Sequence, residues 1–443
     1  MSDLLTIGAS GVAAFNRALT TTGDNIANSQ TDGYARRTVQ LNQMPGAGDV
    51  RFYRRNVRPG GVAMAGVQRS VNEWLNADAR ASASESGRTA SRLNWVSAAE
   101  RALDDGDAGV GTSATAMFNA ADTLANDPTN DSLRQGFLQA VDDVATAFRR
   151  TADGLESVAS GMGADAAASV SQLNTDLADL DRVNQALSKS LDGSTNRATL
   201  LDERDRLLDN ISSSLAVTVA FDPRGLATVR MDGTSSDLLL SPTTLATVEV
   251  GQAANGALSF AVDGVAVVPM SGKLAGLSEA AAEVAGQRSA LDTLAAQFAS
   301  QLNGAHQSGV DANGDTGGAL LALSGGAATL QAVALLPAQV AASSGGKSNG
   351  MLIDLASLRG AAGVEAGWSA QVAAHAQAVA AAKSQDSAAT TRQQGAAAAR
   401  AEVSGVDLDH EAAELIRFQQ AYQAAASVVQ VARDTVQSIL DII

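Results

Sequence analysis

The chain of 443 residues contains no cysteine, three histidines and few aromatic residues. Without cysteine it cannot form disulfides, thiolate metal sites or a cysteine nucleophile. The histidines, at His306, His375 and His410, are too widely separated to match the spacing of zinc ligands. Aromatic residues make up 3% of the chain while alanine is abundant, and this composition favours long helices packed closely in bundles.

Positive charge and long apolar runs are also scarce. The net charge of −16 argues against nucleic acid or an anionic membrane as the main partner. No stretch approaches the roughly 18 apolar residues of a membrane span. The opening segment has no basic region, uninterrupted apolar run or cleavage motif of a secretory signal. We therefore expect a cytosolic chain, or one exported without a cleaved signal peptide.

The segment from Leu408 to Ile443 has the most regular pattern in the chain. One row follows a 4-3 spacing: Leu408, Ala412, Leu415, Gln419, Tyr422, Ala426, Val429, Arg433, Val436, Leu440 and Ile443. A second row runs beside it, from Phe418 to Ile442. This repeat of 3.5 residues is typical of a coiled coil, and Asp407 favours a helix start. Two adjacent rows predict a helix that packs against several others.

The N-terminal segment repeats the same spacing. Its row comprises Leu4, Gly8, Val12, Phe15, Leu19, Thr22 and Ile26, and Asp32-Gly33 is a turn signal after it. Both ends of the chain are thus predicted to be heptad-like helices, which we expect to pair with each other as a coiled coil. The alternative is an ordinary amphipathic helix on a globular core.

Arginine is concentrated between Thr31 and Ser70, where short strands are expected at about 34–41 and 61–67. The basic band comprises Arg36, Arg37, Arg51, Arg54, Arg55, Arg58 and Arg69. With Phe52 and Tyr53 interleaved, one interpretation is a nucleic-acid patch. In so acidic a chain, we instead expect the band to meet acidic faces of neighbouring domains or subunits.

The middle of the chain is mostly helical in pattern. Helices are predicted at about 70–104, 115–126, 132–160, 164–191, 196–215, 278–302 and 364–402. From about residue 216 the period changes to two, and Asn255-Gly256 and Asp263-Gly264 are typical hairpin turns. The predicted fold is mainly α, a bundle of long helices with an inserted small β domain of hairpins.

No segment has the residues of an enzyme or cofactor site. Asp202 lies in a salt-bridged helix, where an ion pair with Arg206 is expected. Gly345–Ser348 lacks the first glycine and the preceding strand of a phosphate loop. Residues 311–317 have three oxygen ligands of a calcium loop without its glycine or final glutamate. We favour a polar turn there, with calcium binding as the alternative, and predict no catalytic residues, cofactor or metal.

Two motifs resemble those shared by axial proteins of the bacterial flagellum. The N-terminal motif is Asn25-Ile-Ala-Asn28, Thr31, Gly33-Tyr34 and Arg36. The C-terminal motif is Ser404-Gly-Val-Asp-Leu-Asp409, Glu411 and Phe418-Gln-Gln-Ala-Tyr-Gln-Ala424. Neither motif separates rod, hook and junction proteins from one another.

Interior segments resemble the flagellar hook-associated protein 1 (FlgK) family. They are Leu124-Ala-Asn-Asp-Pro128 with Arg134, Asn196 followed by Leu201-Asp-Glu-Arg-Asp205, and Gln301-Leu-Asn303 with His306, Gly309, Asp311 and Gly314. The sequence departs from the family at Leu320-Leu321, where a phenylalanine pair is common, and in its short central insertion. The size of the outer domain is therefore open.

The resemblance implies a structural hook–filament junction protein, not an enzyme, located in the extracellular flagellum after type III export. The implied partners are further copies of the chain, the hook protein, a second hook-associated junction protein and a cytoplasmic export chaperone on the C-terminal helix. Nucleic acid and membrane insertion are not expected. The alternative is another flagellar axial protein, such as the hook protein.

This interpretation also defines the expected domains and interface. An inner terminal-helix domain is expected from residues 1–57 and 403–443, a middle helical domain from 58–215 and 275–402, and an outer β domain from 216–274. The expected assembly interface comprises Leu4, Val12, Phe15, Leu19, Ile26, Leu408, Leu415, Tyr422, Val429, Val436, Leu440 and Ile443.

Overall fold

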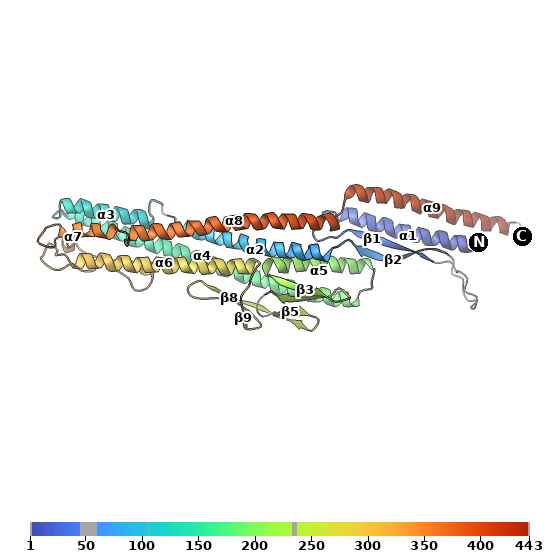
Figure 1. Ribbon diagram of the computed structural model, residues 1–443, viewed down its shortest axis with the longest axis horizontal. Helices are drawn as coiled ribbons and strands as arrows, with labels where there is room; N and C mark the ends of the chain where they lie inside the picture. Colours follow the sequence, from blue (N-terminus) through green and yellow to red (C-terminus); the bar gives the residue numbers. More distant parts are fainter. Residues whose placement is uncertain (1, 45–59, 105, 233–236, 442–443) are drawn as a thin grey trace. The chain divides into compact units, whose positions relative to one another are not determined.

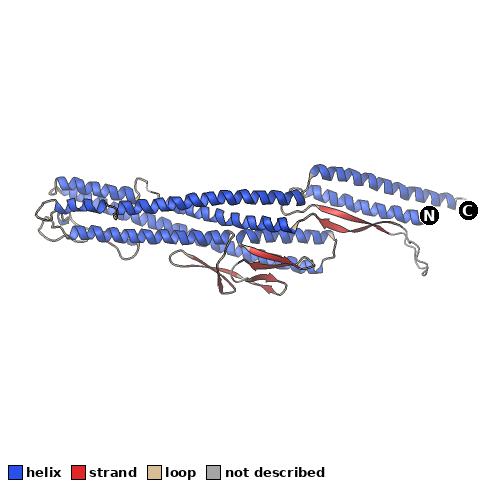
Figure 2. Cartoon of the chain, viewed as in Figure 1, coloured by secondary structure: helices blue, strands red, loops and turns tan. Residues whose placement is uncertain are grey.

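The computed structural model describes residues 2–44, 60–104, 106–232 and 237–441. The chain divides into two compact units built from interleaved segments. Unit 1 contains residues 1–84, 173–247 and 390–443, and unit 2 contains 85–172 and 248–389. Three long helices contribute residues to both units: α2 (Glu73–Ala102), α4 (Asp131–Lys189) and α8 (Val364–Ser404). Helices predominate over small antiparallel sheets (Figures 1 and 2), which confirms the predicted fold class.

Unit 1 contains the first and last helices of the chain. Its further elements are α1 (Ser2–Ala27), β1 (Arg37–Met44), β2 (Gly61–Arg69), α5 (Thr195–Ser214), β3 (Val217–Phe221), β4 (Ala227–Met231), β5 (Leu238–Ser241), β6 (Thr244–Leu245) and α9 (Leu408–Leu440). β1 and β2 form an antiparallel pair that packs on α1, and β3 to β6 form a second antiparallel sheet. Gly66 has a φ of +153°, and a Cβ there would lie 2.8 Å from Gly193 Cα, so only glycine lets β2 approach the α4–α5 connection this closely.

Unit 2 is a helical bundle with small sheets. Its further elements are α3 (Val110–Asn126), β7 (Val248–Gln252), β8 (Leu258–Val262), β9 (Val265–Val267), α6 (Lys273–Gln307), β10 (Leu321–Ala322), β11 (Gln331–Ala332) and α7 (Gly350–Leu355). Phe148 of α4 stacks on Phe298 of α6, with ring centroids 6.1 Å apart, in a core that also contains the buried Trp368. The predicted turn between β8 and β9 is present, with positive φ angles of 48° at Asp263 and 78° at Gly264.

The helix α4 differs from the sequence prediction. The pattern predicts separate helices at 132–160 and 164–191, but α4 is unbroken from Asp131 to Lys189. A Cβ on Gly161 would lie 3.0 Å from the Trp95 ring, and one on Gly163 would collide with the Gln252 side chain. These glycines therefore permit close packing inside a helix, despite a propensity cost of about 1 kcal/mol each. The predicted break is wrong.

Candidate assembly interface

The terminal helices α1 and α9 lie side by side within unit 1 (Figure 1). Gly8 lies against Val429 and Gly11 against Ala425, while Asn25 is hydrogen-bonded to Glu411. Since residue numbers rise along α1 as they fall along α9, the two helices are antiparallel. The step from Gly11 to Asn25 and the step from Glu411 to Ala425 each span two heptads, so the helices keep a common coiled-coil register. The predicted pairing of the chain's end helices is confirmed.

Small residues set the distance between α1 and α9. A Cβ atom added at Gly8 would lie 2.8 Å from Val429 Cγ2 and 3.1 Å from Val429 N. One added at Gly11 would lie 3.1 Å from Ala425 Cβ. Because non-bonded carbon atoms pack best at 3.5–4.0 Å, a larger side chain at Gly8 would push the helices apart.

The predicted interface residues divide into two groups. The half-buried group comprises Val12, Phe15, Leu19, Ile26, Leu415, Tyr422 and Val429. The exposed group comprises Leu4, Leu408, Val436 and Leu440, and Ile443 lies outside the described residues. The fully buried positions on these helices include Ala14, Ala18, Glu411 and Ala432 instead. The selection of large apolar side chains missed these positions, because the buried residues in the contact are small or, at Glu411, charged.

A buried carboxylate joins the start of α9 to the end of α1. The Glu411 side chain is 1% exposed and accepts hydrogen bonds from Arg36 Nε at 2.7 Å and Asn25 Nδ2 at 2.9 Å. Asn25 Oδ1 in turn accepts from the Tyr34 hydroxyl at 2.8 Å and from Arg37 N at 3.0 Å. Burial raises the pKa of Tyr34 to about 12, so this hydroxyl stays a donor at neutral pH. The N- and C-terminal sequence motifs therefore meet in one polar cluster.

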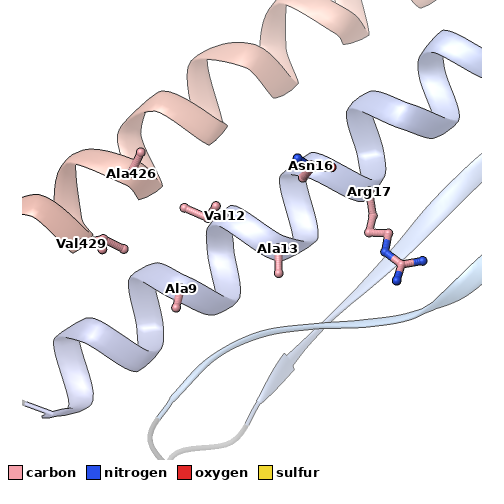
Figure 3. A pocket seen from close by; sticks show the side chains of 7 residues that line it. All are labelled: Ala9, Val12, Ala13, Asn16, Arg17, Ala426 and Val429. Carbon is pink, nitrogen blue, oxygen red and sulfur yellow. The ribbon is translucent and has the colours of Figure 1, made fainter.

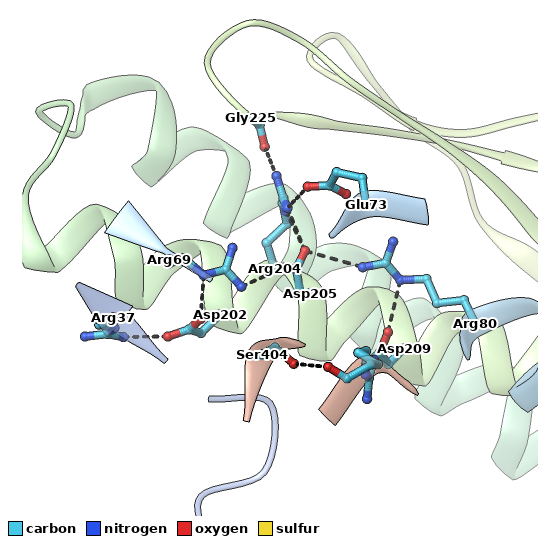
Figure 4. Close-up of polar contacts among 11 residues, drawn as sticks. Arg37, Arg69, Glu73, Arg80, Asp202, Arg204, Asp205, Asp209, Gly225 and Ser404 are labelled. Carbon is cyan, nitrogen blue, oxygen red and sulfur yellow. Dashed lines mark hydrogen bonds and ion pairs between the residues drawn. The ribbon is translucent and has the colours of Figure 1, made fainter. Parts of the chain in front are cut away.

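A second set of buried charges connects distant segments of unit 1 (Figure 4). This arginine–aspartate network comprises Arg37, Arg69, Arg80, Asp202, Arg204, Asp205, Asp209 and Arg400. Arg37 lies 2.5 Å from Asp202, and Arg69 lies 2.7 Å from both Asp202 and Asp205. These contacts fix both strands of the β1–β2 pair to α5.

The network also reaches two long helices. Asp209 lies 3.0 Å from Arg80 of α2 and 2.6 Å from Arg400 of α8. Burial by itself would raise the pKa of Asp205, but the charges of Arg204 and Arg69 outweigh it and the pKa is lowered. Removal of Asp205 would leave the buried charges of Arg69 and Arg204 without this partner, which is strongly destabilising.

The predicted ion pair between Asp202 and Arg206 is wrong. Arg206 pairs with Glu203 at 2.6 Å, because Asp202 faces the β1–β2 pair and accepts from the arginines of those strands. The same strands carry part of the predicted basic band, and Arg36, Arg37 and Arg69 pair with acidic side chains of other segments within unit 1. The rest of the band, Arg51, Arg54, Arg55 and Arg58, lies outside the described residues.

A groove of about 520 Å³ lies between the terminal helices (Figure 3). It is lined by Ala9, Val12, Ala13, Asn16 and Arg17 of α1 and by Ala426 and Val429 of α9. Most of this lining is small and apolar, and exposed Arg17 supplies its positive charge.

The candidate calcium loop is a turn closed by its own backbone. Asp311 Oδ1 accepts hydrogen bonds from Asn313 N at 2.8 Å and Asp315 N at 2.9 Å. In the part of the chain that the structure describes, no cluster of three or more histidines and carboxylates could hold a metal ion. Gly345 and Gly346, of the candidate phosphate loop, have positive φ angles and lie in a tight hairpin turn closed by backbone hydrogen bonds between Ser344 and Lys347.

Buried His306 has a local structural role in unit 2. Its Nδ1 donates to Gly318 O at 2.7 Å, and its Nε2 accepts from Ala341 N at 2.9 Å, a pattern that requires the neutral ring. Burial lowers its pKa accordingly. Among the described helices, none combines the length and apolar character needed to cross a membrane.

Two family models match the chain. Residues 96–321 match the helical domain of flagellar hook-associated protein FlgK, and residues 394–442 match the C-terminal region of flagellar basal body rod FlgEFG proteins. The second match covers α9 and the end of α8. Both matches are to flagellar proteins, so the class is that of flagellar axial proteins.

Curated relatives and a solved structure agree with these matches. Flagellar hook-associated protein 1 of Escherichia coli K12 is 27% identical, with 72% of this chain and 59% of that protein aligned. The Bacillus subtilis 168 protein of the same name is 25% identical, with 97% and 96% aligned. The flagellar hook junction protein FlgK from Burkholderia pseudomallei superposes with a TM-score of 0.50 and 21% identity over 57% of this chain and 47% of that one, which shows the fold alone.

The FlgK model alone matches about half of the chain. The chain therefore belongs to the FlgK family of flagellar hook-associated proteins. The interior match does not favour the alternative of another axial protein such as the hook protein. The aligned region spans 59% of the length of the E. coli relative.

Proposed function

We propose that the chain is a structural component that connects the flagellar hook to the filament, and that it assembles through α1 and α9. The observation that carries this proposal is that the helix pair leaves large apolar side chains exposed: Leu4, Leu408, Ile416, Val431, Val436, Ile439 and Leu440. Each such side chain contributes roughly 1.5–3 kcal/mol when fully buried between copies. The polypeptide is a passive adaptor and performs no catalysis.

The proposed partners follow from that role. Copies of the chain contact each other through the terminal helices, while the hook protein and a second hook-associated junction protein lie on either side. A cytoplasmic export chaperone covers the apolar residues of α9 before export. The site of action is the extracellular flagellum, and neither nucleic acid nor membrane insertion is involved.

The proposed domains assign assembly to the chain ends. Residues 1–57 and 403–443 form the inner, tube-forming part. Residues 58–215 and 275–402 form the middle helical part, and 216–274 form the outer β part. The buried contact of Asn25 with Glu411 supports the first assignment, because it joins the two terminal segments.

Deletion of the gene tests the function. We expect cells with complete hooks that shed their filaments, with attachment restored by the wild-type chain. Unfinished hooks would favour the hook-protein alternative, and firmly attached filaments would contradict the proposal.

Complementation with two matched variants tests the interface. Leu440→Asp places a charge on α9, whereas Leu336→Asp makes the same change at a residue of unit 2 that is exposed to a similar degree (63% and 68%). We expect Leu440→Asp alone to lose filament attachment. Equal activity of the two variants would contradict a role for this end of α9.

A further inference from the structure

Four asparagines of the chain are each followed by glycine: Asn255, Asn303, Asn313 and Asn349. All of them lie in unit 2. The backbone nitrogen of the next residue can attack the side-chain amide carbon of an asparagine, and glycine permits this approach because it has no side chain in the way. From the sequence alone the four pairs are equivalent. The structure separates them by how firmly it holds each side-chain amide and each glycine N–H.

Asn303 is held on both sides of the reacting atoms. Its amide donates to Leu321 O at 2.8 Å and accepts from the N–H groups of Leu320 and Leu321 at 2.8 and 2.9 Å. Gly304 lies inside α6, where its N–H is bonded within the helix. Reaction at this pair therefore requires the end of α6 to open and these side-chain hydrogen bonds to break.

Asn349 and Asn255 are each held at one of the reacting groups. The half-buried Asn349 side chain donates to Ala125 O at 2.9 Å. Asn255 is exposed between β7 and β8, but Gly256 beside it is buried and donates its N–H to Ala253 O at 2.8 Å. Both are hydrogen bonds of ordinary length, so each slows the reaction.

Asn313 is held loosely at both reacting groups. Asn313 and Gly314 are exposed in the turn that begins at Asp311. Asn313 Nδ2 donates to Asp311 Oδ2 at 3.3 Å, and Gly314 N donates to Asp311 O, also at 3.3 Å. These distances exceed the usual 2.9–3.0 Å, so both bonds are weak. The Asp311 carboxylate also faces the Gly314 N–H, but its closer partners are the N–H groups of Asn313 and Asp315.

The turn also has room for ring closure. A Cβ atom built on Gly314 would have no heavy atom within 4 Å apart from its chain neighbours. By the same measure, one on Gly256 would lie 2.9 Å from Ala159 Cβ. The backbone at Gly314 can therefore rotate toward the Asn313 amide without displacing packed atoms, whereas the backbone at Gly256 cannot.

We propose that Asn313 is a site of spontaneous deamidation. The Gly314 nitrogen loses its proton to hydroxide and attacks the amide carbon of Asn313. A new C–N bond forms, the bond from that carbon to Nδ2 breaks, and the amide group leaves as ammonia after taking up a proton. Water then opens the cyclic imide at either carbonyl, which leaves aspartate or isoaspartate. No atom is oxidised or reduced, and water is the net co-reactant.

Deamidation changes the electrostatics of the turn. Where Asn313 Nδ2 now donates to Asp311 Oδ2, the product places a second carboxylate, and the contact becomes a repulsion between like charges. Isoaspartate also lengthens the main chain inside the turn by one carbon. The turn is closed by Asp311 N on Asp315 O at 2.8 Å and by Asp315 N on Asp311 Oδ1 at 2.9 Å. We expect both of these hydrogen bonds to loosen.

Ageing of the purified full-length chain tests the site. The folded chain is incubated at pH 9 and at pH 6 and then digested, and fragmentation mass spectra locate each conversion of amide to acid. We expect Asn313 to react at least about tenfold faster than Asn303, whose reaction waits for local opening of α6. Asn255 and Asn349 should also react more slowly than Asn313. In denaturant, all four should react at similar rates.

Two variants at the same position separate the reaction from its effect. Asn313→Gln keeps the amide but would have to close a larger, less favourable ring, so conversion at this position should disappear while conversion of Asn255 is unchanged. Asn313→Asp mimics the product. Hydrogen exchange of the Asp315 amide should accelerate about fivefold in this variant, the size expected for one exposed charge contact. Asn255→Asp, a matched change in another exposed turn, should leave that amide unaffected.

The rates decide the proposal. Conversion of Asn313 that is no faster than that of Asn303 in the folded chain would overturn it. The same preference for Asn313 in denaturant would also overturn it, because the local sequence and not the fold would then select the site. The chemistry is measured on the isolated chain, so either result leaves the proposed junction role untouched.

Discussion

Arg36 Nε lies 2.7 Å from Glu411 Oε1, although the two residues are 375 positions apart in the chain. The carboxylate is almost fully buried, while Arg36 is 23% exposed. The contact therefore fixes the position of α9 along α1. A shift of α9 would leave the Glu411 carboxylate buried without its partner.

The terminal helices are predicted to be mobile in a dilute monomer and to become ordered on assembly. Helices that expose apolar side chains are marginal in water without further packing. In limited proteolysis, we expect cleavage within both ends before any within the rest of the chain, and circular dichroism should show a gain of helix on polymerisation. Protected ends in a dilute monomer would contradict this.

Glu411→Gln is expected to loosen α9 in the assembled protein by about 2 kcal/mol. The variant removes the charge opposite Arg36 and weakens the bond from Asn25, and partial exposure of Arg36 limits the loss. Hydrogen exchange of α9 amides should accelerate by about 30-fold. Glu414→Gln, whose partner Arg417 is 66% exposed, should change the exchange little. Similar effects of the two variants would show that burial of Glu411 has no special importance.

Gly8→Ala is expected to weaken the helix pair by about 1–3 kcal/mol, because the added Cβ would lie 2.8 Å from Val429 Cγ2. Recruitment to hooks and polymerisation should both fall. Gly23→Ala on the same helix has no atom within 4 Å of the new Cβ and should be stabilising by up to about 1 kcal/mol. Unchanged recruitment and polymerisation of Gly8→Ala would mean that α1 and α9 pack with a wider spacing.

Asp205→Asn is expected to destabilise unit 1 by about 3–5 kcal/mol, because it leaves Arg69 and Arg204 buried without their shared partner. Denaturant unfolding followed by circular dichroism measures the change. Asp192→Asn, at a side chain that is 93% exposed, should change stability by less than about 0.5 kcal/mol. Comparable losses in both would contradict a special role for the network.

The same carboxylate predicts an acid dependence. The pKa of Asp205 is lowered in the folded state from its usual 3.8, so the unfolded state binds the proton first as the pH falls. The stabilisation is present well above pH 3.8 and is lost progressively as the pH falls below it toward the folded-state pKa. The loss between pH 5 and pH 3 should be smaller in Asp205→Asn than in the wild type, and equal losses would contradict the assignment.

His306 predicts a pH dependence in a different range. Its pKa is lowered from the usual 6.5 by burial, so an unfolded chain takes up a proton that the folded chain refuses. The free energy of unfolding is therefore unaffected by this group above pH 6.5. It decreases as the pH falls below 6.5, by up to about 1.4 kcal/mol per pH unit. Unfolding at pH 7.5 and pH 5.5, followed by tryptophan fluorescence, should show a smaller pH effect in His306→Gln, which retains the other two histidines.

Local sequence patterns predicted those parts of the fold that depend on local chemistry. The 4-3 rows predicted α1, α9 and their pairing, and Asp263-Gly264 predicted a hairpin turn that adopts the expected backbone. Glycine did not decide whether a helix ends or continues. Gly161 and Gly163 are equally compatible with a helix end and with close packing inside α4.

The arginine–aspartate network could not be predicted in the same way. Spacing rules for a helix surface pair Asp202 with Arg206, but the true partners, Arg37 and Arg69, are 165 and 133 residues distant. Only the tertiary fold brings such side chains together. The concentration of arginine between Thr31 and Ser70 indicated that acidic partners were needed, but not which ones.

The interleaving of the two units has a consequence for the export proposed above, in which the chain would be delivered end-first. Every residue of unit 2 lies between Glu85 and Ala389, whereas unit 1 needs both the first and the last segments. Whichever end emerges first, unit 2 has all of its sequence available while unit 1 is still incomplete. Under that proposal, closure of α9 against α1 would come last, and a chain halted partway through export would lack one half of the terminal-helix pair.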